Sequence, residues 1–168
     1  MRNIALIGVM GCGKTEASLL LAYKLKRDVI EIDMNIERHM GMKIKEIFAK
    51  YGEKKFRELE RNEIRRASRH QNVIISTGGG AVLNEEAMTE LKKTSTVVFI
   101  ERDLDEIIRT VDTTTRPLLK DGAQVLYDIY AKREALYRKY ADKTIINNGT
   151  LDELVDNIIS ACKKEEYV

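Results

Sequence analysis

Proline, tryptophan and long apolar stretches are scarce or missing in this sequence. Pro117 is its one proline, tryptophan does not occur, and no apolar run approaches the ~18 residues that a membrane span needs. Nothing in the composition marks a linker, a repeat or a domain boundary, so we expect one domain over residues 1–168. The apolar run at residues 4–8 is too short for a secretory signal, and we expect a soluble, cytoplasmic protein that does not bind membranes.

Clusters of metal-binding or strongly basic residues are also missing. Cys12 and Cys162 are the only cysteines and lie far apart, and His39 and His70 are isolated, so no zinc-ligand spacing occurs. The 29 basic and 27 acidic residues leave a net charge of +2 without a dense basic stripe. This balance gives no support for nucleic-acid binding, although it is compatible with a locally basic pocket for an anionic substrate.

Short apolar runs alternate with segments of helical length. The runs are rich in valine, isoleucine and leucine, which is typical of parallel strands buried on both faces. We expect strands at residues 3–7, 29–32, 72–76, 96–100 and 144–146. We expect helices at residues 15–26, 54–69, 104–110, 124–140 and 151–163. The alternation predicts an α/β fold, a doubly wound α/β/α sandwich whose ligands bind at the carboxyl ends of the strands.

A glycine-rich loop follows the first expected strand. Residues 8–15, Gly-Val-Met-Gly-Cys-Gly-Lys-Thr, match the pattern G-x-x-x-x-G-K-[ST] in the required setting between a strand and a helix. Glycines let the backbone N–H groups wrap closely around phosphate oxygens, and the helix N-terminus adds to the attraction. Lys14 supplies a charge for the β- and γ-phosphates, and the Thr15 hydroxyl can bind Mg²⁺. Cys12 either fills a tolerant position or carries a reactive thiol at the helix start.

Two acids end the second expected strand. Glu31 and Asp33 are two residues apart, so on a strand their side chains would point to the same side, toward the phosphate loop. One carboxylate can hold a magnesium-bound water, and the other can orient or deprotonate an attacking hydroxyl. Solvated charge at the end of a strand is the alternative interpretation.

A second glycine cluster and several arginines complete the pattern. The triplet at residues 78–80 follows the third strand and suits close approach of a ligand to the backbone, or a tight turn. Arg109 and Arg116 flank a polar stretch that can act as a lid over a transferring phosphoryl group. Arg133 and Tyr137 share one helix face. Each arginine alone is more often a surface residue than a ligand.

Taken in order, these motifs resemble the shikimate kinase family over nearly the whole chain. The resemblance rests on the Gly-Lys-Thr loop, Asp33 with Ile36-Glu37, Phe56-Arg57-x-x-Glu60, Gly78-Gly79-Gly80-Ala81, Arg116-Pro117-Leu118-Leu119 and Arg133-x-x-x-Tyr137. It implies an ATP-dependent kinase that phosphorylates the 3-hydroxyl of shikimate, on the pathway to chorismate and the aromatic amino acids. It also implies a monomer with a five-stranded parallel sheet of the P-loop NTPase, nucleoside monophosphate kinase-like type. The lid would lie at about 110–122 and the substrate-binding helices at about 34–62.

The resemblance further implies the residues of the site. For catalysis it implies Lys14, Asp33 and Arg116. For ATP it implies Gly11, Cys12, Gly13, Lys14, Thr15, Glu16, Arg109, Arg116 and Asn148, the last with Asn147 in an adenine-binding loop. For shikimate it implies Asp33, Arg57, Gly78, Gly79, Gly80 and Arg133, with the two arginines on the carboxylate. For Mg²⁺ it implies Thr15 and, through water, Glu31.

One position departs from the family pattern. The family usually has aspartate where this chain has Glu31, and the extra methylene moves the carboxylate relative to a metal. Another small-molecule kinase with the same loop, such as a gluconate kinase, is an alternative, as is a nucleotide kinase. A nucleotide-binding regulator without catalysis is a third, and Glu31 is the one feature that favours it.

Overall fold

The strands of the described residues, 1–110 and 122–163, form one parallel sheet in the computed structural model. Their order is β2-β3-β1-β4-β5, and each neighbouring pair is parallel. Their bounds are β1 Asn3–Ile7, β2 Val29–Glu31, β3 Ile74–Ser76, β4 Ser95–Glu101 and β5 Lys143–Ile146. β1 and β3 are buried along their whole length, which explains their uninterrupted apolar sequences.

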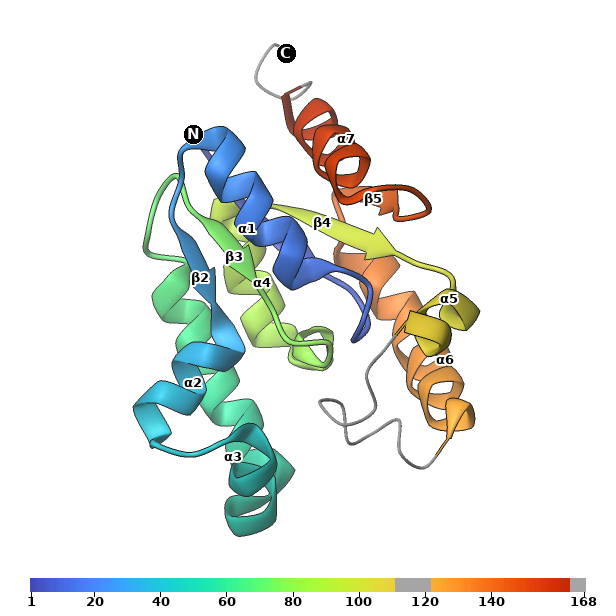
Figure 1. The fold of residues 1–168 in the computed structure, drawn as a ribbon. Helices are drawn as coiled ribbons and strands as arrows, with labels where there is room; N and C mark the ends of the chain where they lie inside the picture. The colour runs from blue at the N-terminus through green and yellow to red at the C-terminus, as the bar shows by residue number, and fades with distance from the viewer. Residues whose placement is uncertain (111–121, 164–168) are drawn as a thin grey trace.

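Helices cover both faces of the sheet, so the predicted three-layer sandwich is confirmed (Figure 1). They are α1 Lys14–Leu25, α2 Ile32–Met40, α3 Ile44–Ala67, the 3-10 turn η1 Ala81–Leu83, α4 Glu85–Thr94, α5 Leu104–Thr110, α6 Ala123–Tyr140 and α7 Leu151–Lys163. α1 packs beside α7 on one face, and α3 packs beside α4 on the other. In Figure 1 β2 and β3 point downward, toward α2 and α3, while β4 points to the right, toward α5 and α6.

β4 extends one residue beyond the prediction at each end and β5 begins one residue earlier, whereas β3 and β2 are shorter than predicted. β3 begins at Ile74 and not at residue 72, because Asn72 has a φ of 60°, which is the left-handed region and not extended backbone. β2 ends at Glu31, one residue before the predicted end, and Ile32 already begins α2. The prediction that Glu31 and Asp33 lie on one strand is therefore wrong. Asp33 lies in the first turn of a helix.

Two helices, α2 and α4, were not among those expected from the apolar pattern, although α2 falls in the region that the resemblance assigns to substrate binding. α3 begins earlier than predicted and changes direction at Gly52, whose backbone is non-helical with φ 81°. Glycine adopts that conformation without strain, so a single long element can bend there. The lid expected at about 110–122, with Arg116, lies outside the described residues except for its two ends.

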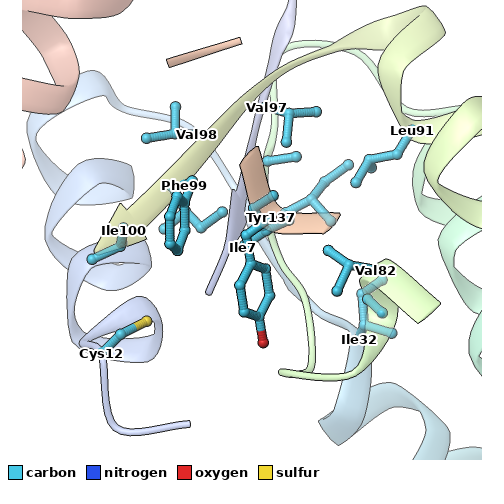
Figure 2. Close-up of a cluster of buried hydrophobic side chains, with 14 of the residues drawn as sticks. Ile7, Cys12, Ile32, Val82, Leu91, Val97, Val98, Phe99, Ile100 and Tyr137 are labelled. Carbon is cyan, nitrogen blue, oxygen red and sulfur yellow. The ribbon is translucent and has the colours of Figure 1, made fainter. Parts of the chain in front are cut away.

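The core lies on both faces of the sheet, between its strands and the helices that cover them. Figure 2 shows Phe99 and Ile100 of β4 close to Ile7, with Tyr137 of α6 beside them. The rings of Phe99 and Tyr137 stack with their centroids 5.1 Å apart. The Tyr137 hydroxyl points out of this apolar cluster, so the ring anchors α6 while its polar end remains available to the loops below the sheet.

None of the helices in residues 1–110 and 122–163 combines the length and apolarity of a transmembrane span.

Candidate active site

Three loops that leave neighbouring strands meet at one edge of the sheet. The order β2-β3-β1 places the loop after β1, the start of α2 and the glycine triplet after β3 side by side. Thr77 fastens the last of these to the first strand, because its backbone N–H and its hydroxyl both donate to the Leu6 carbonyl, at 3.2 and 2.9 Å. Parallel strands that end together thus bring distant sequence motifs into one place.

The loop after β1 closes around the Lys14 side chain. The Nζ atom donates to the carbonyls of Gly8 at 2.6 Å and Val9 at 3.1 Å, and only 8% of the residue is exposed. Gly11 and Gly13 have φ values of 79° and 106°, in the left-handed region that favours glycine. The ammonium therefore lies at the centre of the loop, where phosphate oxygens can replace the two carbonyls as its partners.

Cys12 points into the protein beneath this loop. Its side chain is fully buried, and a Cβ on Gly8 would come within 2.7 Å of its Sγ atom. The thiol thus fills space under the loop, and the reactive alternative has no exposed sulfur to support it. Thr15 and Glu16, in contrast, are exposed in the first turn of α1.

Glu31 is held by a serine that the sequence analysis did not single out. The single proton of the Ser18 hydroxyl can be donated to Glu31 Oε1 at 2.9 Å or to the Thr15 backbone carbonyl at 2.7 Å, so Ser18 lies between the two predicted metal-site residues. Among the described residues no group of three or more histidine, cysteine or acidic side chains could hold a metal. The Thr15 hydroxyl and the Glu31 carboxylate nevertheless fit Mg²⁺, because this ion commonly takes one or two protein ligands and completes its shell with phosphate oxygens and water.

Asp33 faces the glycine triplet with an unused oxygen. Its Oδ1 atom is buried and has no hydrogen-bond partner among the described residues. A Cβ on Gly78 would lie 2.7 Å from that oxygen, so only glycine leaves room for the carboxylate. Burial raises the pKa of Asp33, and the Lys14 ammonium opposes this shift. A carboxylate with a raised pKa and a free oxygen is suited to accept a hydroxyl proton.

Arg57 of α3 approaches the same triplet from the other side. A Cβ on Gly80 would lie 2.5 Å from its NH2 atom, so the guanidinium rests directly against the glycine backbone. Its NH1 atom donates to Glu60 Oε1 at 2.9 Å, and Glu53 Oε1 lies 3.5 Å from NH2. The fork is thus fixed in place while its side chain stays partly exposed.

Glu60 is the buried partner that fixes Arg57. Its side chain is almost entirely buried, and its Oε2 atom has no partner among the described residues. Burial raises the pKa of Glu60 to about 7, against the opposing effect of Arg57. The sequence analysis quoted Glu60 within a motif but gave it no role, although its position three residues after Arg57 on a helix predicts a contact.

Arg133 and Tyr137 of α6 cover the middle of the triplet. The Tyr137 hydroxyl donates to the Gly79 carbonyl at 2.6 Å, and burial raises the pKa of this tyrosine. A Cβ on Gly79 would lie 3.7 Å from Arg133 NH1 and 3.3 Å from the Met10 backbone nitrogen. Asp33, Arg57 and Arg133 therefore surround one stretch of backbone that carries no side chains, next to the phosphate loop.

Other predicted site residues lie apart from this group. Arg109 is exposed at the end of α5, where its guanidinium pairs with Glu106 at 2.5 Å. Asn148 is exposed after β5, and Arg116 lies outside the described residues. Asn147 contacts the phosphate loop through its side-chain amide, which donates to the Cys12 carbonyl at 2.9 Å.

Comparisons with known proteins agree on one family. The family model described as shikimate kinase matches residues 10–163. A shikimate kinase of Thermodesulfovibrio yellowstonii is 42% identical over 164 residues, covering 95% of this chain and 94% of that protein. A shikimate kinase of Clostridium botulinum is 36% identical over 159 residues, covering 94% and 96%. The structure of shikimate kinase from Acinetobacter baumannii in complex with shikimate superposes with a TM-score of 0.93 at 32% identity, covering 100% and 96%.

The raised pKa of Glu60 predicts a pH-dependent difference in stability. A carboxyl whose pKa rises on folding from 4.5 to about 7 stabilises the fold at low pH and loses that contribution as the pH rises through about 7. Glu60→Gln has no such proton to lose. The free energy of unfolding of this variant, minus that of the unsubstituted chain, should therefore rise by roughly 1–3 kcal/mol as the pH goes from about 5 to about 8. Thermal unfolding at several pH values measures this.

Glu58→Gln is the matched control, since Glu58 lies on the same helix but is half-exposed. Between about pH 5 and about pH 8 its free energy of unfolding, relative to the unsubstituted chain, should change less than that of Glu60→Gln. Parallel pH profiles for Glu60→Gln and the unsubstituted chain would contradict the assignment.

Proposed function

Since this chain belongs to the shikimate kinase family, we propose that it transfers the γ-phosphate of ATP to the 3-hydroxyl of shikimate, giving shikimate 3-phosphate and ADP. The observation that carries the assignment of the site is the unpartnered, buried Oδ1 of Asp33 between the phosphate loop and the glycine triplet. An acceptor hydroxyl placed there meets a proton acceptor on one side and the phosphate loop on the other. The product belongs to the pathway to chorismate and aromatic amino acids.

Arg57 and Arg133 are proposed to bind the substrate carboxylate. Both guanidinium groups lie against the backbone of the triplet, one at Gly80 and the other at Gly79. A planar fork of N–H donors matches the geometry of a carboxylate, and two positive charges exceed what a neutral acceptor would need. With Gly78, these residues and Asp33 make up the proposed shikimate site.

ATP is proposed to bind through the loop after β1. The proposed contacts are Gly11, Cys12, Gly13, Lys14, Thr15, Glu16, Arg109, Arg116 and Asn148. Lys14 would exchange its two carbonyl partners for phosphate oxygens. Its ammonium group would then stabilise the negative charge on the phosphates during the transfer. Arg116 is proposed from the resemblance to act as the lid arginine.

Mg²⁺ is the proposed cofactor, held by the Thr15 hydroxyl and, through water, by the Glu31 carboxylate. When bound, it would neutralise charge on the β- and γ-phosphates. Ser18 compensates for the extra methylene of Glu31, because a hydrogen bond to one carboxylate oxygen limits how the longer side chain can turn. We further propose that the enzyme is a cytoplasmic monomer whose partners are ATP and shikimate alone.

Release of ADP in a coupled assay with ATP, Mg²⁺ and shikimate tests the function directly. Gluconate and quinate serve as parallel acceptors. Release with shikimate alone would support the proposal and leave no role for a gluconate kinase activity. ATP binding without release on any acceptor would instead favour the nucleotide-binding regulator.

Asp33→Asn should bind ATP with nearly unchanged affinity and turn over more slowly by a factor on the order of 10² or more, because the amide cannot accept the hydroxyl proton. Steady-state kinetics beside calorimetric ATP binding measure the two effects. Near-normal turnover would remove Asp33 from the mechanism.

Arg57→Ala should weaken shikimate binding roughly 10- to 150-fold through loss of a charge-assisted contact, with little effect on ATP binding. Arg61→Ala is the matched control, one turn further along α3, where Arg61 pairs with Glu86 at 2.8 Å. Binding isotherms for shikimate and ATP distinguish the two variants. An equal loss of shikimate affinity in both would point to the charge of the helix and not to Arg57.

Ser18→Ala should raise the Mg²⁺ concentration needed for half-maximal ATP binding roughly three- to tenfold, because Glu31 loses the hydrogen bond that orients it. Calorimetric titration of ATP at a series of Mg²⁺ concentrations measures the change without relying on turnover. Ser68→Ala removes another buried hydroxyl, which donates to the Ile64 carbonyl at 2.8 Å far from the loop, and should leave the Mg²⁺ requirement unchanged. The same shift in both variants would rule out the positioning role of Ser18.

A further inference from the structure

Asn147 holds the outside of the phosphate loop. Its side-chain nitrogen donates to the Cys12 carbonyl at 2.9 Å, although the two residues are 135 positions apart in the sequence. Its backbone N–H donates to the Glu101 carbonyl at 2.7 Å, which continues the pairing of β5 with β4 by one residue. The backbone of Asn147 is therefore held by the sheet, while its side chain contacts the phosphate loop.

Asn147 contacts both residues of the Cys12–Gly13 peptide bond. A Cβ on Gly13 would lie 2.9 Å from the Asn147 side-chain nitrogen, so the amide packs directly against that glycine. In a trans peptide the C=O of one residue and the N–H of the next point in opposite directions. Turning the Cys12 carbonyl toward Asn147 thus turns the Gly13 N–H toward the other side of the loop. Asn147 occupies the side of the Cys12–Gly13 peptide bond toward which the carbonyl points. The opposite side, toward which the Gly13 N–H points, is the one where phosphate can bind.

Arg102 restrains the neighbouring peptide in the same way. It follows β4, and its NH1 atom donates to the Gly11 carbonyl at 2.9 Å. Gly11 and Gly13 both have positive φ values, and glycine has the largest conformational freedom to lose on ordering. The side chains that directly follow β4 and β5 donate to consecutive loop carbonyls, and these hydrogen bonds supply the restraint that the glycines lack.

We infer that Asn147 is a positioning residue of the phosphate loop, with Arg102 as a second one, and that it acts on the triphosphate of the nucleotide and not on the base. The inference rests on the proposed function, since it takes ATP as the ligand of the loop. It differs from the expectation that Asn147 belongs to an adenine-binding loop, which stays a prediction. Asn148, which is exposed beside it, is not part of the inference.

Binding of ligand fragments separates the two roles. Asn147→Ala should weaken inorganic tripolyphosphate and ATP by the same factor, roughly three- to tenfold, and leave any affinity for adenosine unchanged. The KM for ATP should rise with the KM for shikimate unaltered. Asn147→Ser provides a smaller change should the alanine variant fold poorly, and should give the same pattern. Asn62→Ala, an exposed amide on α3, is the control and should leave all three affinities as they are.

Weaker adenosine binding with unchanged tripolyphosphate binding would overturn the inference in favour of a contact with the base. Unchanged affinity for all ligands would overturn it as well. In both cases ADP release by the unsubstituted chain would leave the proposed function standing. An unsubstituted chain that binds neither ATP nor tripolyphosphate would overturn both.

Discussion

A side chain at any position of the glycine triplet would crowd a different part of the site. At Gly78 a Cβ would lie 2.7 Å from Asp33 Oδ1, and at Gly80 it would lie 2.5 Å from Arg57 NH2. At Gly79 it would press on the backbone of the phosphate loop. The bare backbone thus sets how closely the acid, the arginine and the loop can approach one another. Three glycines in a row lose side-chain packing and cost chain entropy on folding. The site requires them because Asp33, Arg57 and the phosphate loop all lie against the triplet backbone.

The charges around the triplet are arranged for a ligand. Asp33 is half-buried and Glu60 is buried, and burial raises the pKa of both carboxyls. Each keeps one buried oxygen without a partner among the described residues. The positive charges of Lys14 and Arg57 oppose part of the pKa rise that burial causes in these two carboxyls. Such partial satisfaction destabilises the fold, and it is found where a substrate completes the hydrogen bonds. The two acids have different partners, because Glu60 accepts a hydrogen bond from Arg57 while Asp33 faces the glycine backbone at Gly78.

Much of the fold was predictable because its signals are local. Buried parallel strands read as plain apolar runs, and the phosphate loop has a pattern that only one kind of strand-to-helix turn satisfies. The errors arose where a local signal was missing. Asn72 takes a left-handed φ that nothing in the apolar pattern reveals, and β2 stops at Glu31 because its pairing with β3 stops there. The role of Glu60 was within reach through helical spacing, whereas the contacts of Ser18 and Asn147 were not.

The sequence by itself determined the five strands in chain order, most of the helices, the phosphate loop and the residue types that the site needs. These types are a lysine, acids, arginines and glycines in a family-specific order. The tertiary structure alone decided which of them meet. Ser18 reaches Glu31, Arg102 reaches Gly11 and Asn147 reaches Cys12 because parallel strands end at one edge. These are single hydrogen bonds between residues far apart in the chain. No periodicity or spacing encodes them, since they depend on strand order and on side-chain direction in the folded state.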